Sequence, residues 1–239
     1  MARPIEALAA QLTSGLDSER AVAVRIHDYV RDDITFGFTP QHDRATPEET
    51  LAAGVGHTIP KTALFIALLR AAGLRAYPHF VTIDHEILRG VFPNDAHRLL
   101  PWEVPHCYAE VEIEDDWWQV DSYALDTTLW RAAVARLARE GDLLGYGAHG
   151  FGTCRWDGAG DAFAQLATPD MVVEDHGAWE SAKAFLGSRA ASARDRALAW
   201  ETLFSLETGP FAAAAAARVN AHLDGLRNGV SAVATIGQV

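Results

Sequence analysis

A long apolar run lies near the middle of the first half of the chain. Residues 63–72 contain only one polar side chain, Arg70. A helix that is apolar on all sides is normally buried in a core. The run therefore predicts a buried helix over residues 58–72, and Gly73 is expected to end it because glycine readily adopts the left-handed conformation of a helix C-terminus.

Three other segments have the pattern of strands, at residues 75–83, 106–113 and 117–123. The first two are separated by residues 84–105, which contain three prolines. Proline interrupts both helices and sheets. We expect this segment to be a loop that lies over the functional site.

The N-terminal part of the chain carries helix signals. Residues 5–31 predict two short helices, the second capped by Ser18. Thr46 is expected to cap a further helix, with Pro47 at its first position and Glu49 at the capping-box position.

Beyond residue 125 the pattern changes. Residues 128–139 predict a helix, and the glycine-rich residues 141–160 predict an irregular loop. Three Ala-rich segments are further helix candidates: residues 178–186, 192–207 and 211–226. We therefore predict an α+β fold in which residues 1–125 form the core and residues 126–239 form a helical C-terminal extension, packed on that core as a single structural unit.

The composition narrows the class of protein. The chain has 239 residues, of which 49% are hydrophobic, and a formal net charge of −12. This charge argues against nucleic acid and anionic membrane as partners, because both require a concentrated basic surface. The two cysteines, Cys107 and Cys154, cannot form a disulfide framework and are typical of a reducing compartment. No apolar run approaches the roughly 18 residues of a membrane span, and no secretory leader pattern is present, so we expect a cytoplasmic protein.

Three segments carry residues with catalytic potential. In GVGHTIPKTALFIALLRAAGL, two glycines lead to Thr58 at the start of the predicted buried helix. The N-terminus of a helix offers unpaired N–H groups and a positive dipole end, which favour a developing oxyanion. The second segment, PHCYAEVEI, begins with His106, and the third, WWQVDSY, contains Asp121.

This order of pieces resembles the transglutaminase-like family, a branch of the papain-like cysteine enzymes. The resemblance covers about residues 20–125 and includes Gly54, Gly56, Lys61 and Trp118. It implies a Cys-His-Asp triad, in which cysteine attacks an amide or ester carbonyl, histidine is the acid and base, and aspartate orients the histidine. His106 and Asp121 carry over to this chain, but Thr58 occupies the place of the cysteine.

The sequence does not decide between several roles for Thr58. A threonine hydroxyl is not ionised near neutral pH and needs a base in direct contact to act as a nucleophile. His106 or His57 is the candidate base. Alternatively, Thr58 is a helix N-cap whose oxygen accepts from the backbone N–H near Lys61, or it is a hydrogen-bonding group for the substrate.

The strand pattern places a condition on the pair of His106 and Asp121. The two share a face only if the turn between their strands has two or four residues, because a three-residue turn reverses the face. Cys107 is expected on the opposite face, in the core. Cys154 lies in the glycine-rich loop, which can bring it anywhere.

Other residues complete the expected site. His57, Ile59, Lys61, Tyr108 and Tyr123 are candidates for binding the substrate or its oxyanion.

We expect no metal and no cofactor, because neither HExxH nor CxxC spacing is present. His79 and His85 are the histidines, besides His57 and His106, that a converging metal site would use. Asp84, next to His85 and Glu86, is not expected to join a ligand set with both neighbours.

The sequence thus predicts a transglutaminase-like enzyme with a Thr-His-Asp constellation, acting on a small-molecule or peptide-like carbonyl substrate. Acyl transfer or hydrolysis through Thr58 is one reaction, and non-covalent acid/base chemistry such as cyclisation, isomerisation or lyase chemistry is the other. A catalytically inactive binding protein that holds a ligand in the same pocket is the alternative, and a metal hydrolase is a third hypothesis. The helical C-terminal region is a candidate surface for oligomerisation.

Overall fold

The computed structural model describes residues 4–188 and 210–229. Its centre is a four-stranded sheet with the order β5-β4-β3-β8, in which every neighbouring pair is antiparallel. The strands are β3 (Ala76–Asp84), β4 (Glu103–Ile113), β5 (Asp116–Val120) and β8 (Val172–Ala178). Helices and a sheet of this kind make an α+β architecture, as predicted.

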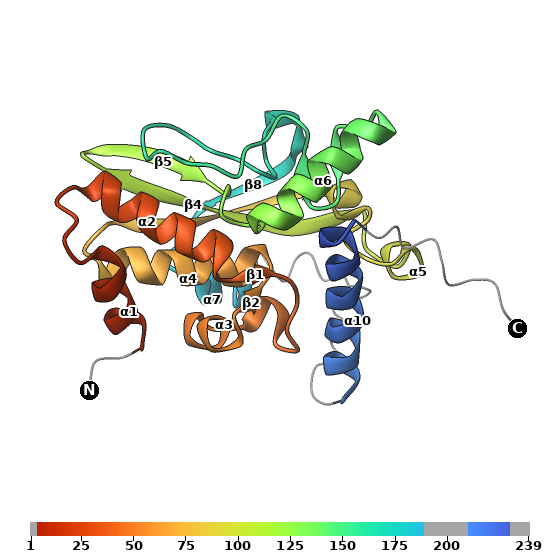
Figure 1. Ribbon diagram of the computed structural model, residues 1–239, viewed down its shortest axis with the longest axis horizontal. Coiled ribbons are helices and arrows are strands. Elements are labelled where there is room, and N and C mark those ends of the chain that lie inside the picture. The colour runs from red at the N-terminus through yellow and green to blue at the C-terminus, as the bar shows by residue number, and fades with distance from the viewer. Residues whose placement is uncertain (1–3, 189–209, 230–239) are drawn as a thin grey trace, which may run out of the picture.

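A layer of helices covers one side of the sheet (Figure 1). It contains α1 (Pro4–Thr13), α2 (Glu19–Asp32), α3 (Pro47–Ala53) and α4 (Thr58–Ala71). The central helix is α4, which contacts α1, α2, α3 and the strands β3 and β4.

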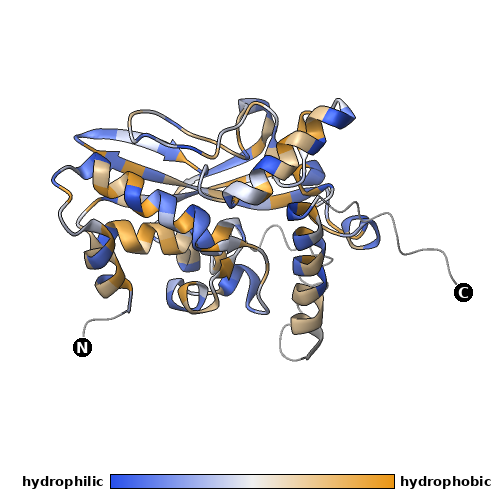
Figure 2. Cartoon of the chain, in the orientation of Figure 1, coloured by the Kyte–Doolittle hydropathy of each residue, from blue (hydrophilic) through white to orange (hydrophobic). Residues whose placement is uncertain are grey.

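The predicted burial of α4 is confirmed. Leu64, Phe65 and Leu68 are completely buried, and they belong to a hydrophobic cluster with Ala109 and Val111 of β4. Figure 2 shows hydrophobic colour along much of α4, whereas the outer helix α2 is mixed. Each Å² of apolar surface removed from water stabilises the fold by about 25 cal/mol. The buried side chains of α4 therefore hold this helix against the sheet.

The predicted helix caps are also present. The Ser18 hydroxyl accepts from the N–H of Ala21 and begins α2. Thr46 and Glu49 form the reciprocal capping box of α3, which ends at Gly54 in the left-handed conformation. These local signals therefore position the loop that leads into α4.

The remaining elements are short, apart from two helices. They are β1 (Thr35–Phe36), η1 (His42–Arg44), β2 (Val55–Gly56), η2 (His85–Leu88), α5 (Asn94–His97), α6 (Thr127–Glu140), β6 (Leu144–Gly145), β7 (Ala148–His149), η3 (Pro169–Met171), α7 (Ala182–Leu186) and α10 (Pro210–Arg227). The short helices η2 and α5 lie within the segment 84–105, which was predicted as loop only. In the part of the chain that the structure describes, no helix has the length and apolar character needed to cross a bilayer.

The C-terminal part differs from the predicted helical extension. Residues 172–178 form β8, which pairs with β3 and completes the sheet. Besides its helices, the region after residue 125 therefore supplies an edge strand that the sequence pattern did not predict. The helix predicted over residues 192–207 lies outside the described residues, and the division at residue 125 stays a prediction.

Lys61 is part of the core and not of the predicted oxyanion site. Its side chain is completely buried, and its ammonium group donates to the carbonyl oxygens of Ile34 (2.6 Å) and Arg31 (3.2 Å). These carbonyls lie at and just after the end of α2, so Lys61 joins that end to the first turn of α4. The prediction that Lys61 supplies charge to a substrate is wrong, because both contacts hold the ammonium inside the core.

The buried lysine predicts a pH dependence of stability. Burial lowers the pKa of Lys61 to about 7, whereas an unfolded lysine titrates near 10.4. Between these values the unfolded chain binds a proton that the native chain lacks, so stability rises with pH. Lys61→Met removes this titration. The free energy of unfolding of the wild type minus that of the variant should increase from about pH 7 to about pH 10, by up to about 1.4 kcal/mol per pH unit.

Urea denaturation of both proteins at several pH values over this range measures that difference. A difference that stays constant with pH would show that the lysine remains charged inside the fold.

Candidate active site

The predicted pair of His106 and Asp121 depends on a tight turn. Only Glu114 and Asp115 connect β4 to β5, and both have positive φ, at 55° and 71°. This is the two-residue hairpin geometry whose twist matches that of the strands. The even turn places Val120 opposite Ala109, so Asp121 follows on the His106 side, as the sequence pattern required.

Asp121 lies where β5 has ended and holds a second segment of chain. Its carboxylate is completely buried. Oδ1 accepts from the N–H groups of Ala164 (2.5 Å) and Gln165 (3.1 Å), and Oδ2 accepts from that of Leu166 (3.0 Å). Hydrogen bonds to an ionised carboxylate are about twice as strong as neutral ones, so Asp121 fixes residues 164–166 beside the site.

His106 faces the same carboxylate. Its Nε2 lies 3.6 Å from Asp121 Oδ2, which is too long for a hydrogen bond. This nitrogen is buried and makes no hydrogen bond to any described residue. A buried polar atom without a partner needs an explanation, and a small closure of the gap to Asp121 supplies one. The imidazole thus has its carboxylate neighbour in place, at a distance just beyond that of a hydrogen bond.

Thr58 is the first residue of α4 and not its cap. The N-cap is His57, and its side chain makes no capping hydrogen bond. The N–H of Lys61 bonds to the His57 carbonyl at 3.0 Å, while the Thr58 hydroxyl donates to Gln165 Oε1 at 2.8 Å. The predicted N-cap role of Thr58 is therefore wrong, because its hydroxyl is turned toward another segment.

The first turn of α4 supplies N–H donors, as predicted. The first N–H groups of a helix have no partner inside the helix, and Pro60 at the third position has none to offer. The donors that remain are the N–H groups of Thr58 and Ile59. The Ile59 side chain itself packs in the core with Phe80 and Cys107, so only its backbone is available to a substrate.

Gln165 joins these pieces, although no sequence pattern predicted it. Besides accepting from Thr58, its side chain donates from Nε2 to the Gly147 carbonyl at 2.7 Å. Its own N–H is one of the three bound by Asp121. In the sequence, Gln165 is marked only as the single polar residue among the apolar residues 162–166. This pattern does not identify Thr58, 107 positions away, as its partner.

His57 has a carboxylate partner that was not predicted either. Its Nε2 lies 2.7 Å from Asp43 Oδ1, and its ring stacks on Phe38 with centroids 4.9 Å apart. Burial, followed by repulsion from His42, lowers the pKa of His57 to about 4. Burial opposes ionisation of Asp43, but His42 and His57 outweigh it and hold the pKa of that carboxyl far below its usual range. His57 is thus a neutral imidazole at neutral pH.

Ligand atoms of His42, Asp43 and His57 lie within 4.8 Å of one another. This is one of two groups among the described residues with the chemistry to hold a metal ion. In this group, however, Oδ1 of Asp43 already accepts a hydrogen bond from Nε2 of His57. A metal ion would have to displace that bond.

The two tyrosines have different positions. Tyr108 lies two residues from His106 on the same strand, stacks on His79 at 4.5 Å and packs in a cluster with Leu166. Its role in binding stays a prediction. Tyr123 is completely buried, and its hydroxyl donates to Thr62 in the middle of α4. The prediction that Tyr123 binds substrate is wrong, because its ring lies in the core against Phe65.

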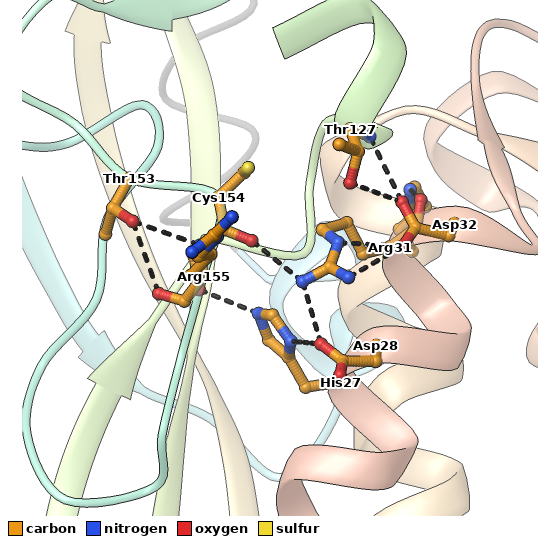
Figure 3. Close-up of polar contacts among 10 residues, drawn as sticks. His27, Asp28, Arg31, Asp32, Thr127, Thr153, Cys154 and Arg155 are labelled. Carbon is orange, nitrogen blue, oxygen red and sulfur yellow. Dashed lines mark hydrogen bonds and ion pairs between the residues drawn. The ribbon is translucent and has the colours of Figure 1, made fainter. Parts of the chain in front are cut away.

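Both cysteines are free and buried. Cys107 lies in the core, where burial raises the pKa of its thiol, and the predicted structural role is confirmed. Cys154 lies beside α2, where its carbonyl accepts from Arg31 at 3.0 Å (Figure 3). It lines a pocket of about 470 Å³ with Arg31, Arg155 and Trp130. None of the predicted site residues lines that pocket.

Comparisons with known proteins bear on this arrangement. The sequence model of the transglutaminase-like superfamily matches residues 6–122. Among solved structures, the chain is similar to the crystal structure of a candidate cysteine protease from Cytophaga hutchinsonii, with 12% identity and a TM-score of 0.43. The alignment covers 75% of this chain and 43% of that chain, so it spans less than half of the solved structure. No curated protein matches the sequence.

The matched residues include the whole of α4, the strand that carries His106, and Asp121. They begin nearer the N-terminus than the sequence resemblance and include most of α1, which packs against α4. Residues 6–122, in which a buried helix packs on an antiparallel sheet, match the transglutaminase-like superfamily.

Proposed function

We propose that this protein is an enzyme in which His106 transfers protons to and from a carbonyl substrate without a covalent intermediate. One observation carries the proposal. The Thr58 hydroxyl donates a hydrogen bond to Gln165 Oε1 and not to an imidazole, whereas Nε2 of His106 faces Asp121, which leaves Nδ1 to act as the base. The base is thus available, while the residue in the place of the nucleophile is not activated.

The surrounding groups suit this chemistry. His106 would take a proton from the carbon next to the substrate carbonyl and later return it at the same or another atom. The electron pair released moves onto the carbonyl oxygen, where the N–H groups of Thr58 and Ile59 would bind the enolate at the positive end of α4. Asp121, 3.6 Å from Nε2, would stabilise the imidazolium formed.

A second imidazole lies next to the same helix end. His57 precedes Thr58 in the chain, bonds to Asp43 at 2.7 Å and is coupled electrostatically to His106. Its lowered pKa keeps it neutral and able to accept a proton. Reactions that move a proton between two positions, such as isomerisation, cyclisation or elimination, use two such groups.

Acyl transfer or hydrolysis through Thr58 is less well supported, because a threonine needs a base in contact with its hydroxyl. A binding protein without catalysis is the second candidate. It is favoured by the enclosure of the site, since Thr58 is 7%, His106 4% and Asp121 0% exposed. We place either function in the cytoplasm, where two unpaired thiols are usual, with a small-molecule or peptide-like ligand.

One test of this proposal concerns proton transfer at His106. Incubation of the protein in D₂O with a panel of small carbonyl compounds should lead to deuterium uptake next to the carbonyl of a substrate, measured by mass spectrometry. His106→Ala should lower the uptake rate about 10²–10⁴-fold, the usual contribution of general acid/base catalysis. His222→Gln, which changes a histidine on α10 that contacts Gly90, is the control and should exchange like the wild type.

Uptake that is equal in the wild type and in His106→Ala would eliminate His106 as the base. Binding of a panel compound, detected by calorimetry, without any exchange would favour the binding protein.

Another test examines the helix end and the imidazole together. Thr58→Cys restores the family's residue, and a thiol at a helix N-terminus beside a histidine has a lowered pKa. Iodoacetamide should alkylate the introduced thiol at least about tenfold faster than an ordinary thiol at neutral pH. The double variant Thr58→Cys/His106→Ala should lose most of this acceleration, and the wild type should react slowly because Cys107 and Cys154 are buried.

Peptide mapping identifies the alkylated residue, and Thr58→Cys/Gln165→Ala separates reactivity from access, because it removes the side chain that contacts position 58. Equal alkylation rates with and without His106 in both backgrounds would mean that this histidine does not act on position 58.

A further inference from the structure

A second group of metal-binding side chains lies outside the proposed active site. His85, Glu86 and His97 each place a ligand atom within 4.8 Å of the others. His85 and Glu86 belong to η2, directly after β3, and His97 ends the short helix α5. Asp84 is not part of the group, as expected, because its carboxylate accepts from the N–H of Glu86 at the start of η2.

His85 is prepared to be a ligand. Its Nδ1 lies 2.8 Å from the Pro101 carbonyl oxygen. A carbonyl can only accept, so Nδ1 carries the proton, and in the neutral ring Nε2 has the free lone pair. Metal-binding histidines usually donate their other ring N–H in this way, which fixes the tautomer and the ring orientation. The ring is held further by stacking on Trp102, with centroids 4.9 Å apart.

His97 supplies an independent sign of a ligand. Its Nε2 is buried and has no hydrogen-bond partner among the described residues. The ring lies 5.0 Å from that of His85, centroid to centroid. An imidazole nitrogen without a partner, beside another imidazole and a carboxylate, is the donor set that zinc prefers.

Glu86 completes the set from the other side. Its Oε1 accepts from Arg89 at 2.6 Å, so the second oxygen is the one offered to an ion. The arginine orients the carboxylate, as the hydrogen-bonding partners of metal ligands commonly do.

We propose a binding site for one divalent metal ion, such as zinc, whose ligand atoms are His85 Nε2, Glu86 Oε2 and His97 Nε2. Three protein ligands leave the fourth tetrahedral position for water or another ligand. The ion would join the end of β3 to α5 and so fix the segment between β3 and β4. The group of His42, Asp43 and His57 is less suited, because Nε2 of His57 is already bonded to Asp43.

The test is zinc binding by the untagged full chain after treatment with a chelator. The protein should retain about one zinc per chain after desalting, measured by elemental mass spectrometry, and cobalt should give the visible spectrum of a four-coordinate ion. His97→Ala and Glu86→Gln should each weaken zinc binding by at least about 100-fold, because loss of outer-shell partners alone costs 10–100-fold. His57→Gln is the matched control, since it removes a ligand from the other group, and it should bind zinc like the wild type.

Circular dichroism checks that each variant is folded. His85→Gln, which keeps a hydrogen-bonding side chain at that position, replaces His97→Ala if the latter unfolds. Absence of stoichiometric zinc in the wild type, unchanged binding in Glu86→Gln and the folded histidine variant, or loss of zinc in His57→Gln would each overturn the proposal. None of these outcomes depends on the proposed proton transfer at His106.

Discussion

The carboxylate of Asp121 is the interaction on which the rest of the site depends. It lies at the end of β5, fully buried, and binds three successive backbone N–H groups of residues 164–166. These hydrogen bonds hold residues 164–166, which follow α6 in the chain, beside the end of β5. They thereby place Gln165 next to Thr58. The same carboxylate faces His106. Without it, the loop, the glutamine and the imidazole would have no common anchor.

Threonine at position 58 fits this arrangement. In a papain-like site the residue at the start of the buried helix must be reactive, and a thiolate can be stabilised there by the helix dipole. Threonine cannot ionise, and in this structure its hydroxyl is a hydrogen-bond donor to Gln165. The helix end and the imidazole are present, and they are the parts that the proposed chemistry without a covalent intermediate requires.

Local features could be predicted from the sequence, and long-range ones could not. The buried helix, the Thr46–Glu49 capping box and the even turn at Glu114 depend on neighbouring residues. Asp43 and Gln165 became site residues only through contacts 14 and 107 positions away. Lys61 was misassigned because a lysine near a helix start suggests an exposed charge. Its real partners are two carbonyl oxygens about thirty positions earlier, which no local pattern indicates.

The side chain of Gln165 occupies the Thr58 hydroxyl and the Gly147 carbonyl. Under the proposed function, a ligand that displaces this side chain from the end of α4 must replace or break both hydrogen bonds. If each contributes about 0.5–1.5 kcal/mol, the competent form is rarer, and the apparent affinity weaker, by about 5- to 150-fold. Ligands that can take over both hydrogen bonds escape most of this penalty, whereas water and small electrophiles cannot. Selectivity can therefore reside in the opening of the site as much as in the site itself.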